Sequence, residues 1–218
     1  MGVIPEVSSE KRQYIPMGFM DANTLSSNLV KILPLATLFH FGILSSAMHM
    51  FWVNHVCGRL ESDCRYSKDI VYNNFPWPSE PTSGNSPQPP LRVRGGAEGG
   101  GVMSKGKAEE LVTAIEQAAH GVLDVRARYI TPRPMGEGGA AAPGEGGSSL
   151  ADLYDPVAMP PDLRRAHQEL DKAVDTAYGK KSFASDAERV AFLFELYHKY
   201  TSLLPALEKT KKGKRKKG

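Results

Sequence analysis

Residues 36–50, ATLFHFGILSSAMHM, lie within the longest apolar stretch of the chain. Residues 36–44 mix β-branched and aromatic side chains, and this composition predicts a buried strand. Ser45 or Ser46 can then cap a following helix, whose first backbone amides would otherwise lack acceptors. We expect that helix to run to Val56 and to end at Gly58. Because Pro, Ser and His residues interrupt the apolar stretch, it is predicted to be a buried strand and helix and not a membrane span.

Composition divides the 218 residues into four parts. Residues 1–78 are rich in aromatic and apolar side chains. Residues 79–104 are dominated by Pro, Gly and Ser, which is typical of a flexible linker. Residues 105–204 have a helical pattern that a second low-complexity stretch interrupts at 131–148, and residues 205–218 form a basic tail that we expect to be disordered.

Three amphipathic helices are predicted in the second half of the chain. The first has apolar residues at spacings of three and four from Leu111 to Val125. The second begins at Pro161, a residue type that suits the first turn of a helix. The third begins with a capping box from Ser185 to Glu188, in which each of the two side chains accepts from a free amide. Since isolated amphipathic helices are marginal, these three must pack on one another or on another domain. The predicted fold class is therefore α+β, a small mixed strand and helix domain followed by a three-helix domain, with disordered linkers.

The formal charge of +3 depends on the tail. The last ten residues hold seven Lys or Arg and no acid, so the rest of the chain has 27 − 7 = 20 basic and 24 acidic residues and a charge of −4. Such a tail is usually a solvated, disordered segment. Alternatively, it binds polyanions without sequence preference.

The two cysteines, Cys57 and Cys64, are too few for a disulfide framework, so we expect a reducing, cytoplasmic location. The N-terminus has no apolar signal-peptide core. His55 with the two cysteines offers three zinc ligands, but a Cys-x-x-Cys pair and a fourth ligand are lacking nearby. A buried structural cysteine is the favoured interpretation.

Three motifs resemble catalytic or cofactor sites and are rejected. The glycine-rich residues 95–101 lack the preceding strand and following helix that a nucleotide or methyl-donor loop needs. An adenine-specific methyltransferase needs an acid or amide followed by Pro-Pro and an aromatic residue. Residues 74–77, NFPW, have the wrong order, and residues 159–162, MPPD, lack both flanking groups.

The stretch from Arg59 to Lys68 is the strongest candidate for nucleic-acid contact. The segment from Arg59 to Asp69 is polar and is predicted to be irregular, and it alternates Arg and Lys with Glu61, Ser62 and Asp63. Arginine donates to guanine, a carboxylate accepts from the cytosine amine, and serine can do either, so this mixture can recognise base edges. A plain polar surface loop has the same composition, and both interpretations stay open from the residues alone.

Residues 8–78 resemble the target recognition domain of the MmeI-like type IIG (type IIL) restriction–modification enzymes and related adenine-specific DNA methyltransferases. The second half resembles the small C-terminal helical domain of the same family. Together the matching blocks cover about three quarters of the chain. In the first half they are residues 8–19 (SSEKRQYIPMGF), 36–50, 57–60 (CGRL) and 65–78 (RYSKDIVYNNFPWP), and in the second half they are 149–156 (SLADLYDP), 159–161, 166–167, 170–175 and 186–190.

The resemblance implies a long enzyme with a nuclease domain, a methyl-donor-binding catalytic domain, a recognition domain and a helical end. This chain resembles only the last two pieces, with a partial recognition domain at 1–78. It is expected to carry no catalytic site and no cofactor, whereas the complete enzyme would use S-adenosylmethionine and Mg²⁺. A truncated gene, a frameshifted remnant and a split subunit are all compatible with this.

The leading hypothesis is therefore a module for sequence-specific recognition of double-stranded DNA. The expected partners are DNA and the missing methyltransferase and nuclease domains, or a subunit that carries them, and no membrane. One alternative is an active adenine-specific DNA methyltransferase, and another is a helical interaction module that docks onto a separate methyltransferase subunit. Tyr66 and Trp77 are expected to be packing residues. The candidate DNA-contacting residues are Arg12, Arg59, Arg65 and Lys68, with Glu61 and Asp63 as base-reading acceptors.

Overall fold

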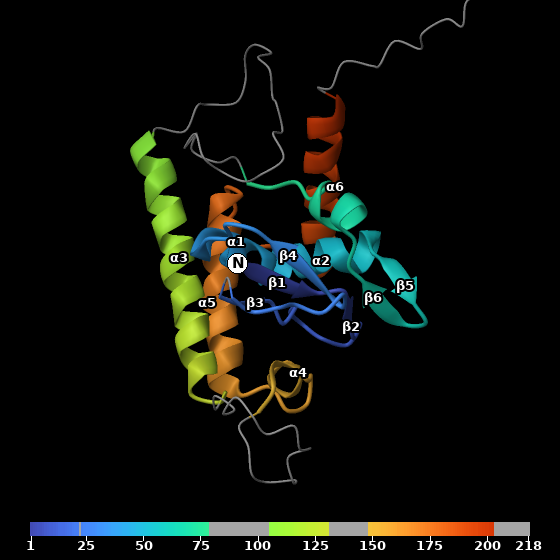
Figure 1. The fold of residues 1–218 in the computed structure, drawn as a ribbon. Coiled ribbons are helices and arrows are strands. Elements are labelled where there is room, and N and C mark those ends of the chain that lie inside the picture. Colours follow the sequence, from blue (N-terminus) through green and yellow to red (C-terminus); the bar gives the residue numbers. More distant parts are fainter. Residues whose placement is uncertain (22, 79–104, 131–147, 203–218) are drawn as a thin grey trace, which may run out of the picture.

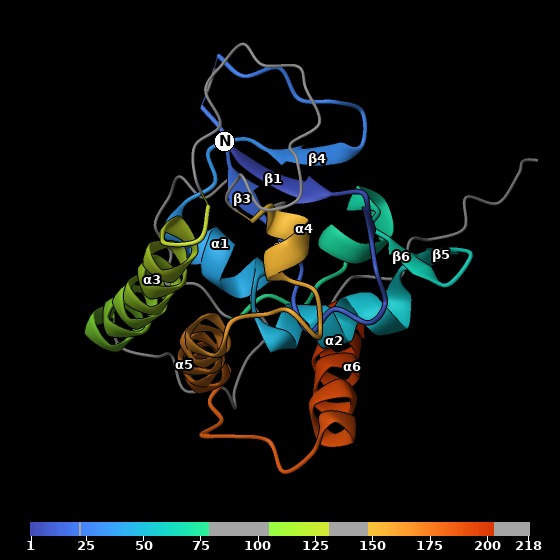
Figure 2. The ribbon, with the colours of Figure 1, turned by 90° about the horizontal axis from the view of Figure 1, so that it is seen from below.

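The computed structural model describes residues 1–21, 23–78, 105–130 and 148–202. Two small antiparallel sheets lie beside a set of helices, and the long helix α3 (Lys105–Ala127) runs next to α5 (Pro161–Ala177) in both ribbon views (Figures 1 and 2). The fold thus mixes helices with small antiparallel sheets, as the sequence predicted. The predicted linkers and the basic tail lie outside the described residues, apart from Ser148.

One N-terminal segment contributes a strand to each sheet. In the first sheet β1 (Gly2–Pro5) is central, between β3 (Gly18–Phe19) and β4 (Val30–Leu33). In the second sheet β6 (Asp63–Arg65) is central, between β2 (Val7–Ser8) and β5 (Gly58–Leu60). Because only Glu6 separates β1 from β2, the two sheets are held close together.

Residues 38–44 form a helix, and the prediction of a strand over 36–44 is wrong. Helix α1 (Leu38–Leu44) begins after Thr37, whose side chain accepts from the amide of His40. The His40 ring in turn lies 3.3 Å from the Thr37 amide, which completes a capping box. Every residue from Phe39 to Leu44 is buried, so the segment has no polar face whose spacing would distinguish a helix from a strand.

Helix α2 (Ala47–Val56) follows almost immediately. Ser46 is its N-cap, whereas Ser45 is the C-cap of α1, so the choice between the two serines is resolved. The helix ends at Val56 as predicted, but Gly58 does not terminate it with a left-handed turn. Cys57 is the C-cap in an extended conformation, and Gly58 already begins β5.

The three predicted helices of the second half are confirmed as α3, α5 and α6 (Asp186–Ser202), and a short helix α4 (Leu150–Leu153) precedes α5. Pro161 occupies the first turn of α5. The Ser185 side chain accepts from the Glu188 amide, but the Glu188 carboxylate accepts from Ala184 and not from Ser185. Helix α6 buries little of its surface, since Leu193 is its one buried residue within the described part.

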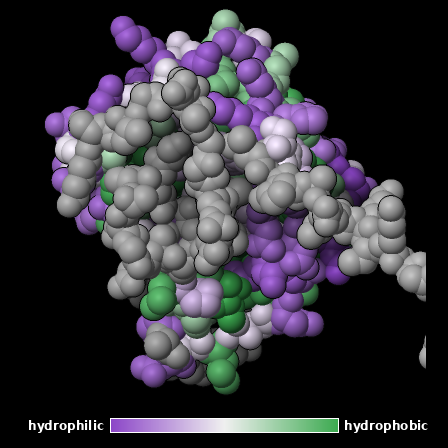
Figure 3. Space-filling model, turned by 90° about the horizontal axis from the view of Figure 1, so that it is seen from above, coloured by the Kyte–Doolittle hydropathy of each residue, from purple (hydrophilic) through white to green (hydrophobic). Residues whose placement is uncertain are grey.

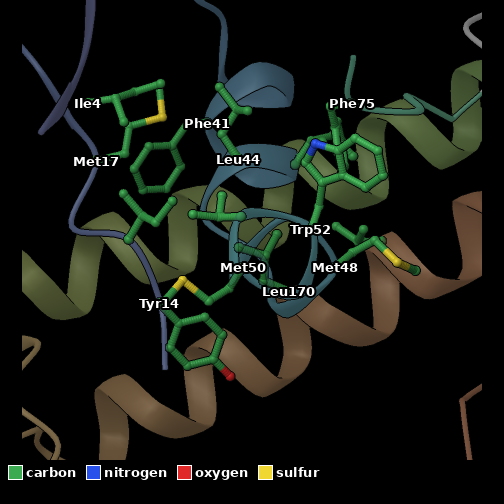
Figure 4. Packing of buried hydrophobic residues seen from close by; sticks show 14 of the residues in the cluster. Ile4, Tyr14, Met17, Phe41, Leu44, Met48, Met50, Trp52, Phe75 and Leu170 are labelled. Atoms are coloured by element: carbon green, nitrogen blue, oxygen red, sulfur yellow. The ribbon is translucent and has the colours of Figure 1, made fainter. Parts of the chain in front are cut away.

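One hydrophobic core joins the two halves of the chain. Phe41 of α1 packs in the same cluster as Ile115 of α3 and Leu170 of α5. Figure 4 shows Tyr14 of the N-terminal segment beside α5, and Met17 next to Ile4 and Phe41. The helices of the second half therefore cover the apolar faces of the first half, while the domain boundary at residue 78 stays a prediction. Tyr66 and Trp77 are buried, in keeping with their predicted packing role.

Candidate recognition hairpin

The stretch from residue 59 to 69 is more regular than predicted. Strands β5 and β6 pair as a hairpin joined by the two residues Glu61 and Ser62, and residues Lys68–Tyr72 form a single π-helical turn, η1. Glu61 has a φ of 55°, which is the left-handed backbone that a tight hairpin turn requires. The hairpin projects from the body of the molecule in both ribbon views (Figures 1 and 2).

Strand alternation places the charged side chains of the hairpin on two opposite faces. Arg59 lies opposite Cys64 in the register, and Leu60 lies opposite Asp63. Directly opposed residues share a face, and successive residues along a strand alternate between faces. Arg59 and the buried Cys64 therefore lie on one face, which we call the inner face. Asp63 and Arg65 lie on the other, which we call the outer face.

On the inner face Arg59 has several internal acceptors. Its Nη2 donates to the carbonyl oxygen of Asn54 in the last turn of α2 at 3.1 Å. Its Nη1 donates to the Ser62 carbonyl oxygen at 3.0 Å and lies 3.4 Å from a carboxylate oxygen of Glu10. The guanidinium group thus ties the hairpin turn to the end of α2, which is a structural role.

On the outer face, only one nitrogen atom of the Arg65 side chain has a hydrogen-bond acceptor among the described residues. Its Nε donates to Glu6 at 3.0 Å, and Nζ of Lys31 donates to the other Glu6 oxygen at 2.7 Å. These two donors, Lys31 first, lower the pKa of the Glu6 carboxyl. The Arg65 side chain is 61% exposed, and within the described part of the chain its two terminal nitrogen atoms have no partner. Glu6 therefore orients Arg65 while its bidentate donor edge stays available.

The remaining candidate residues differ in their surroundings. Glu61 lies at the hairpin tip and Asp63 on the outer face, and neither has a hydrogen-bond partner for its side chain among the described residues. Lys68 is exposed at the start of η1, and its Nζ lies 3.8 Å from the neighbouring Asp69. Arg12 instead donates to the Ser8 hydroxyl at 3.3 Å and to the Ala151 carbonyl oxygen of α4 at 3.5 Å.

The sequence did not indicate the roles of Glu6 and Lys31. They are 59 and 25 positions from the residues they join, Arg65 and Glu6 respectively. Isolated charges at such separations produce no local pattern. Only the pairing of β1 with β4 and of β2 with β6 brings them together.

The described residues contain no group of three or more His, Cys, Asp or Glu that could hold a metal ion. Cys57 and Cys64 are both free. The Cys64 thiol donates to the side-chain oxygen of Asn54 at 3.3 Å, and burial raises its pKa to about 12. Cys64 thus has the buried, structural surroundings that the sequence favoured. None of the helices in the described ranges is long and apolar enough to cross a membrane.

Two family models match the chain. Residues 1–79 match the MmeI target recognition domain, and residues 143–205 match the MmeI C-terminal domain. The chain belongs to the MmeI family. The whole hairpin, η1 and both sheets fall within the matched recognition domain, whereas α5 and α6 fall within the matched C-terminal domain. The resemblance noted in the sequence is therefore confirmed.

Two relatives of this MmeI-family chain are much longer than it is. DNA methyltransferase A of Bacillus subtilis (strain 168) is 38% identical over 199 residues, which cover 91% of this chain and 18% of the relative. The solved structure of the type IIL restriction–modification enzyme MmeI in complex with DNA matches with a TM-score of 0.68 and 42% identity, over 92% of this chain and 21% of that chain. The chain spans about a fifth of the length of these relatives.

Proposed function

We propose that this MmeI-family chain is the sequence-reading module of a restriction–modification DNA methyltransferase, and that the outer face of the β5–β6 hairpin contacts DNA bases. The proposal rests on the position of the outer face and on the side chains that it presents. It lies within a target recognition domain and presents the donor edge of Arg65 beside the carboxylate of Asp63. The solved relative in complex with DNA supports the same class of ligand.

The chemistry of these groups suits the major groove of DNA. That groove admits a two-stranded ribbon, arginine can donate two hydrogen bonds to guanine, and a carboxylate can accept from the cytosine amine. Glu61 at the tip is a second acceptor, and Lys68 is suited to a phosphate, which positions a protein without reading sequence. Arg59 is placed in a supporting role because its donors are engaged internally.

Methyl transfer is assigned to a part of the enzyme other than this chain. S-adenosylmethionine and Mg²⁺ would be bound by that part. The double-stranded DNA and the catalytic domains are accordingly the proposed partners.

A chimera tests the proposal. In it, this chain replaces the matched segment of Bacillus subtilis DNA methyltransferase A, and sequencing of methylated DNA identifies the modified site. We expect the site to differ from that of the unaltered relative, and Arg65→Ala to change it again. The control is Lys172→Ala, which alters an exposed residue on α5, outside the recognition domain. An active chimera that keeps the relative's site would overturn the proposal.

A further inference from the structure

Lys31, Glu6 and Arg65 form a row of three charged side chains that crosses from the first sheet to the second. Lys31 lies on β4, Arg65 lies on β6, and Glu6 is the single residue between β1 and β2. Hydrophilic side chains cover large parts of the described surface in Figure 3, so exposed charge alone marks no site. These three residues differ from ordinary surface charges because each carboxylate oxygen of Glu6 has a different cation as its partner.

Backbone hydrogen bonds on both sides fix the position of Glu6. Its amide donates to the carbonyl oxygen of Leu29 at 2.8 Å, and its own carbonyl oxygen accepts from the amide of Tyr66 at 2.6 Å. The Glu6 side chain is 15% exposed, whereas those of Lys31 and Arg65 are 37% and 61% exposed. The carboxylate is therefore held between the two sheets, and its partial removal from water strengthens its attraction to both cations.

The two cations divide the Glu6 carboxylate between them. Nε of Arg65 donates to Oε1 at 3.0 Å, and Nζ of Lys31 donates to Oε2 at 2.7 Å. An arginine and a carboxylate frequently form a bidentate pair, in which two nitrogen atoms donate to two oxygen atoms. Here that pair is incomplete, because Lys31 occupies the second oxygen. The terminal nitrogens of Arg65 accordingly have no acceptor among the described residues.

We propose that Lys31 is a positioning residue for DNA selectivity, because it prevents Glu6 from binding Arg65 with both oxygens. The terminal nitrogens of Arg65 then stay free to donate to O6 and N7 of a guanine, the base whose edge accepts two such bonds. A lysine suits this task, since its ammonium group is a compact point charge that holds a single oxygen. This inference rests on the proposed function and adds guanine as the base that Arg65 reads.

Removal of Lys31 and removal of Glu6 have opposite consequences for Arg65. Without Lys31, rotation of the Glu6 carboxylate brings Oε2 to a terminal nitrogen of Arg65, and the arginine becomes bound within the protein. Without Glu6, Arg65 loses its orientation but keeps all of its donors. A purely structural ion pair behaves differently, because removal of the second partner then adds to the first loss or leaves it unchanged.

The variant that tests the role is Lys31→Met, which keeps the length of the side chain and removes its charge. In the chimera with Bacillus subtilis DNA methyltransferase A, methylation rates are compared on sites with and without guanine at the position that Arg65→Ala alters. We expect Lys31→Met to lower the ratio of these rates by about tenfold. Adding Glu6→Ala should raise the ratio again, because the competing carboxylate is gone.

The matched control is Lys172→Met. Lys172 also donates to a glutamate at 2.7 Å, but it lies on α5, so its loss should leave the ratio of rates unchanged. Thermal unfolding checks that each variant stays folded.

A second measurement needs only the full chain. Free rotation about the Nε–Cζ bond of an arginine averages the NMR signals of its two terminal nitrogens, whereas a bidentate pair slows the rotation and separates the signals. We expect one averaged signal for Arg65 in the unaltered chain and two separate signals in Lys31→Met. The variant that combines Lys31→Met with Glu6→Ala should again give one.

Two outcomes would overturn the role of Lys31. One is an Arg65 signal that stays averaged in Lys31→Met, and the other is a combined variant that is no more selective than Lys31→Met alone. Failure of the proposed function is distinguishable from both. It appears as a methylation site that Arg65→Ala leaves unchanged, while the NMR signals of the full chain still report whether Glu6 binds Arg65 with one oxygen or two.

Discussion

The carboxylate of Asp171 on α5 accepts a hydrogen bond from the backbone amide of Ala47, the first residue of α2, at 2.7 Å. Its other oxygen accepts from the Tyr14 hydroxyl at 2.8 Å. The group is partly buried, and its removal from solvent raises its pKa to about 6. One side chain of the C-terminal helices therefore joins two separate segments of the recognition domain.

Asp171→Ala should destabilise the whole chain. The substitution leaves a partly buried amide and the hydroxyl of the buried Tyr14 without acceptors, and each such loss costs on the order of 1–3 kcal/mol. Removal of a partly buried carboxylate offsets part of this, so we expect a net loss of about 2 kcal/mol in the free energy of unfolding, measured by urea denaturation at pH 7. Glu169→Ala, an exposed change on the same helix, is the control. Equal midpoints for the two variants would show that the Asp171 contacts contribute little.

Acid should destabilise the chain through its buried histidines. Burial lowers the pKa of His49 to about 3 and that of His167 to about 3. The unfolded chain takes up protons near pH 6.5 that the folded chain does not bind. The stabilisation is therefore present above that pH and is lost as the pH falls toward 3. Between pH 7 and pH 5 the loss is about 2 kcal/mol for each ring.

His49→Gln is the variant that isolates this effect. Whatever its stability at pH 7, it should lose about 2 kcal/mol less than the unaltered chain when the pH is lowered to 5. His55→Gln is the matched control, because His55 is exposed on the same helix. Chemical denaturation at both pH values measures the differences. If the two variants have the same pH dependence, the acid sensitivity originates elsewhere.

The sequence predicted α5 but not α1. The difference is that α5 is buried on one side only, whereas α1 is buried all round. The apolar residues of α5 recur at helical spacing opposite a charged face, so periodicity alone identifies it. Helix α1 is covered on all sides by α2, α3, α5 and Phe19, and it has almost no polar residue to mark its period. Such a segment is distinguished only by its cap, here Thr37 with His40.

The hairpin was predicted to be an irregular loop because its turn lacks the usual signal. Two-residue hairpin turns require positive φ values, and Asn-Gly or Asp-Gly normally supplies them. Here Glu61 adopts that conformation. Composition identifies the charged residues of this segment, but their division between two faces depends on the register of β5 with β6, which composition does not encode.

Gly42 should tolerate no larger residue. A Cβ atom there would lie 2.6 Å from Cγ2 of Ile115 on α3, so alanine would force α1 away from α3. We expect Gly42→Ala to destabilise the chain by about 1–3 kcal/mol despite the better helix propensity of alanine. Gly121→Ala on α3 meets nothing within 4 Å and should instead stabilise by up to about 1 kcal/mol. Thermal unfolding should therefore give midpoint shifts of opposite sign. Shifts of the same sign would mean that the α1–α3 contact is less close than described.

The two arginines of the hairpin should separate stability from DNA selectivity. Arg59→Ala removes the donors to the carbonyl oxygens of Asn54 and Ser62. We therefore expect a lower unfolding temperature and a decrease of about 1–2 kcal/mol in the free energy of unfolding. Arg65→Ala removes one exposed contact to Glu6, which should change stability by less than about 0.5 kcal/mol. In the chimera, however, it should reduce discrimination between base pairs by roughly 1–3 kcal/mol, measured as the ratio of methylation rates on matched and altered sites.

The matched control for both arginines is Lys11→Ala, an exposed change that should alter neither property. Arg59→Lys should restore only part of the stability, because a lysine lacks the planar fork that reaches two carbonyl oxygens at once. If Arg59→Ala shifts the methylated site at full stability, or Arg65→Ala unfolds the hairpin without changing the site, then the inner and outer faces have the opposite roles.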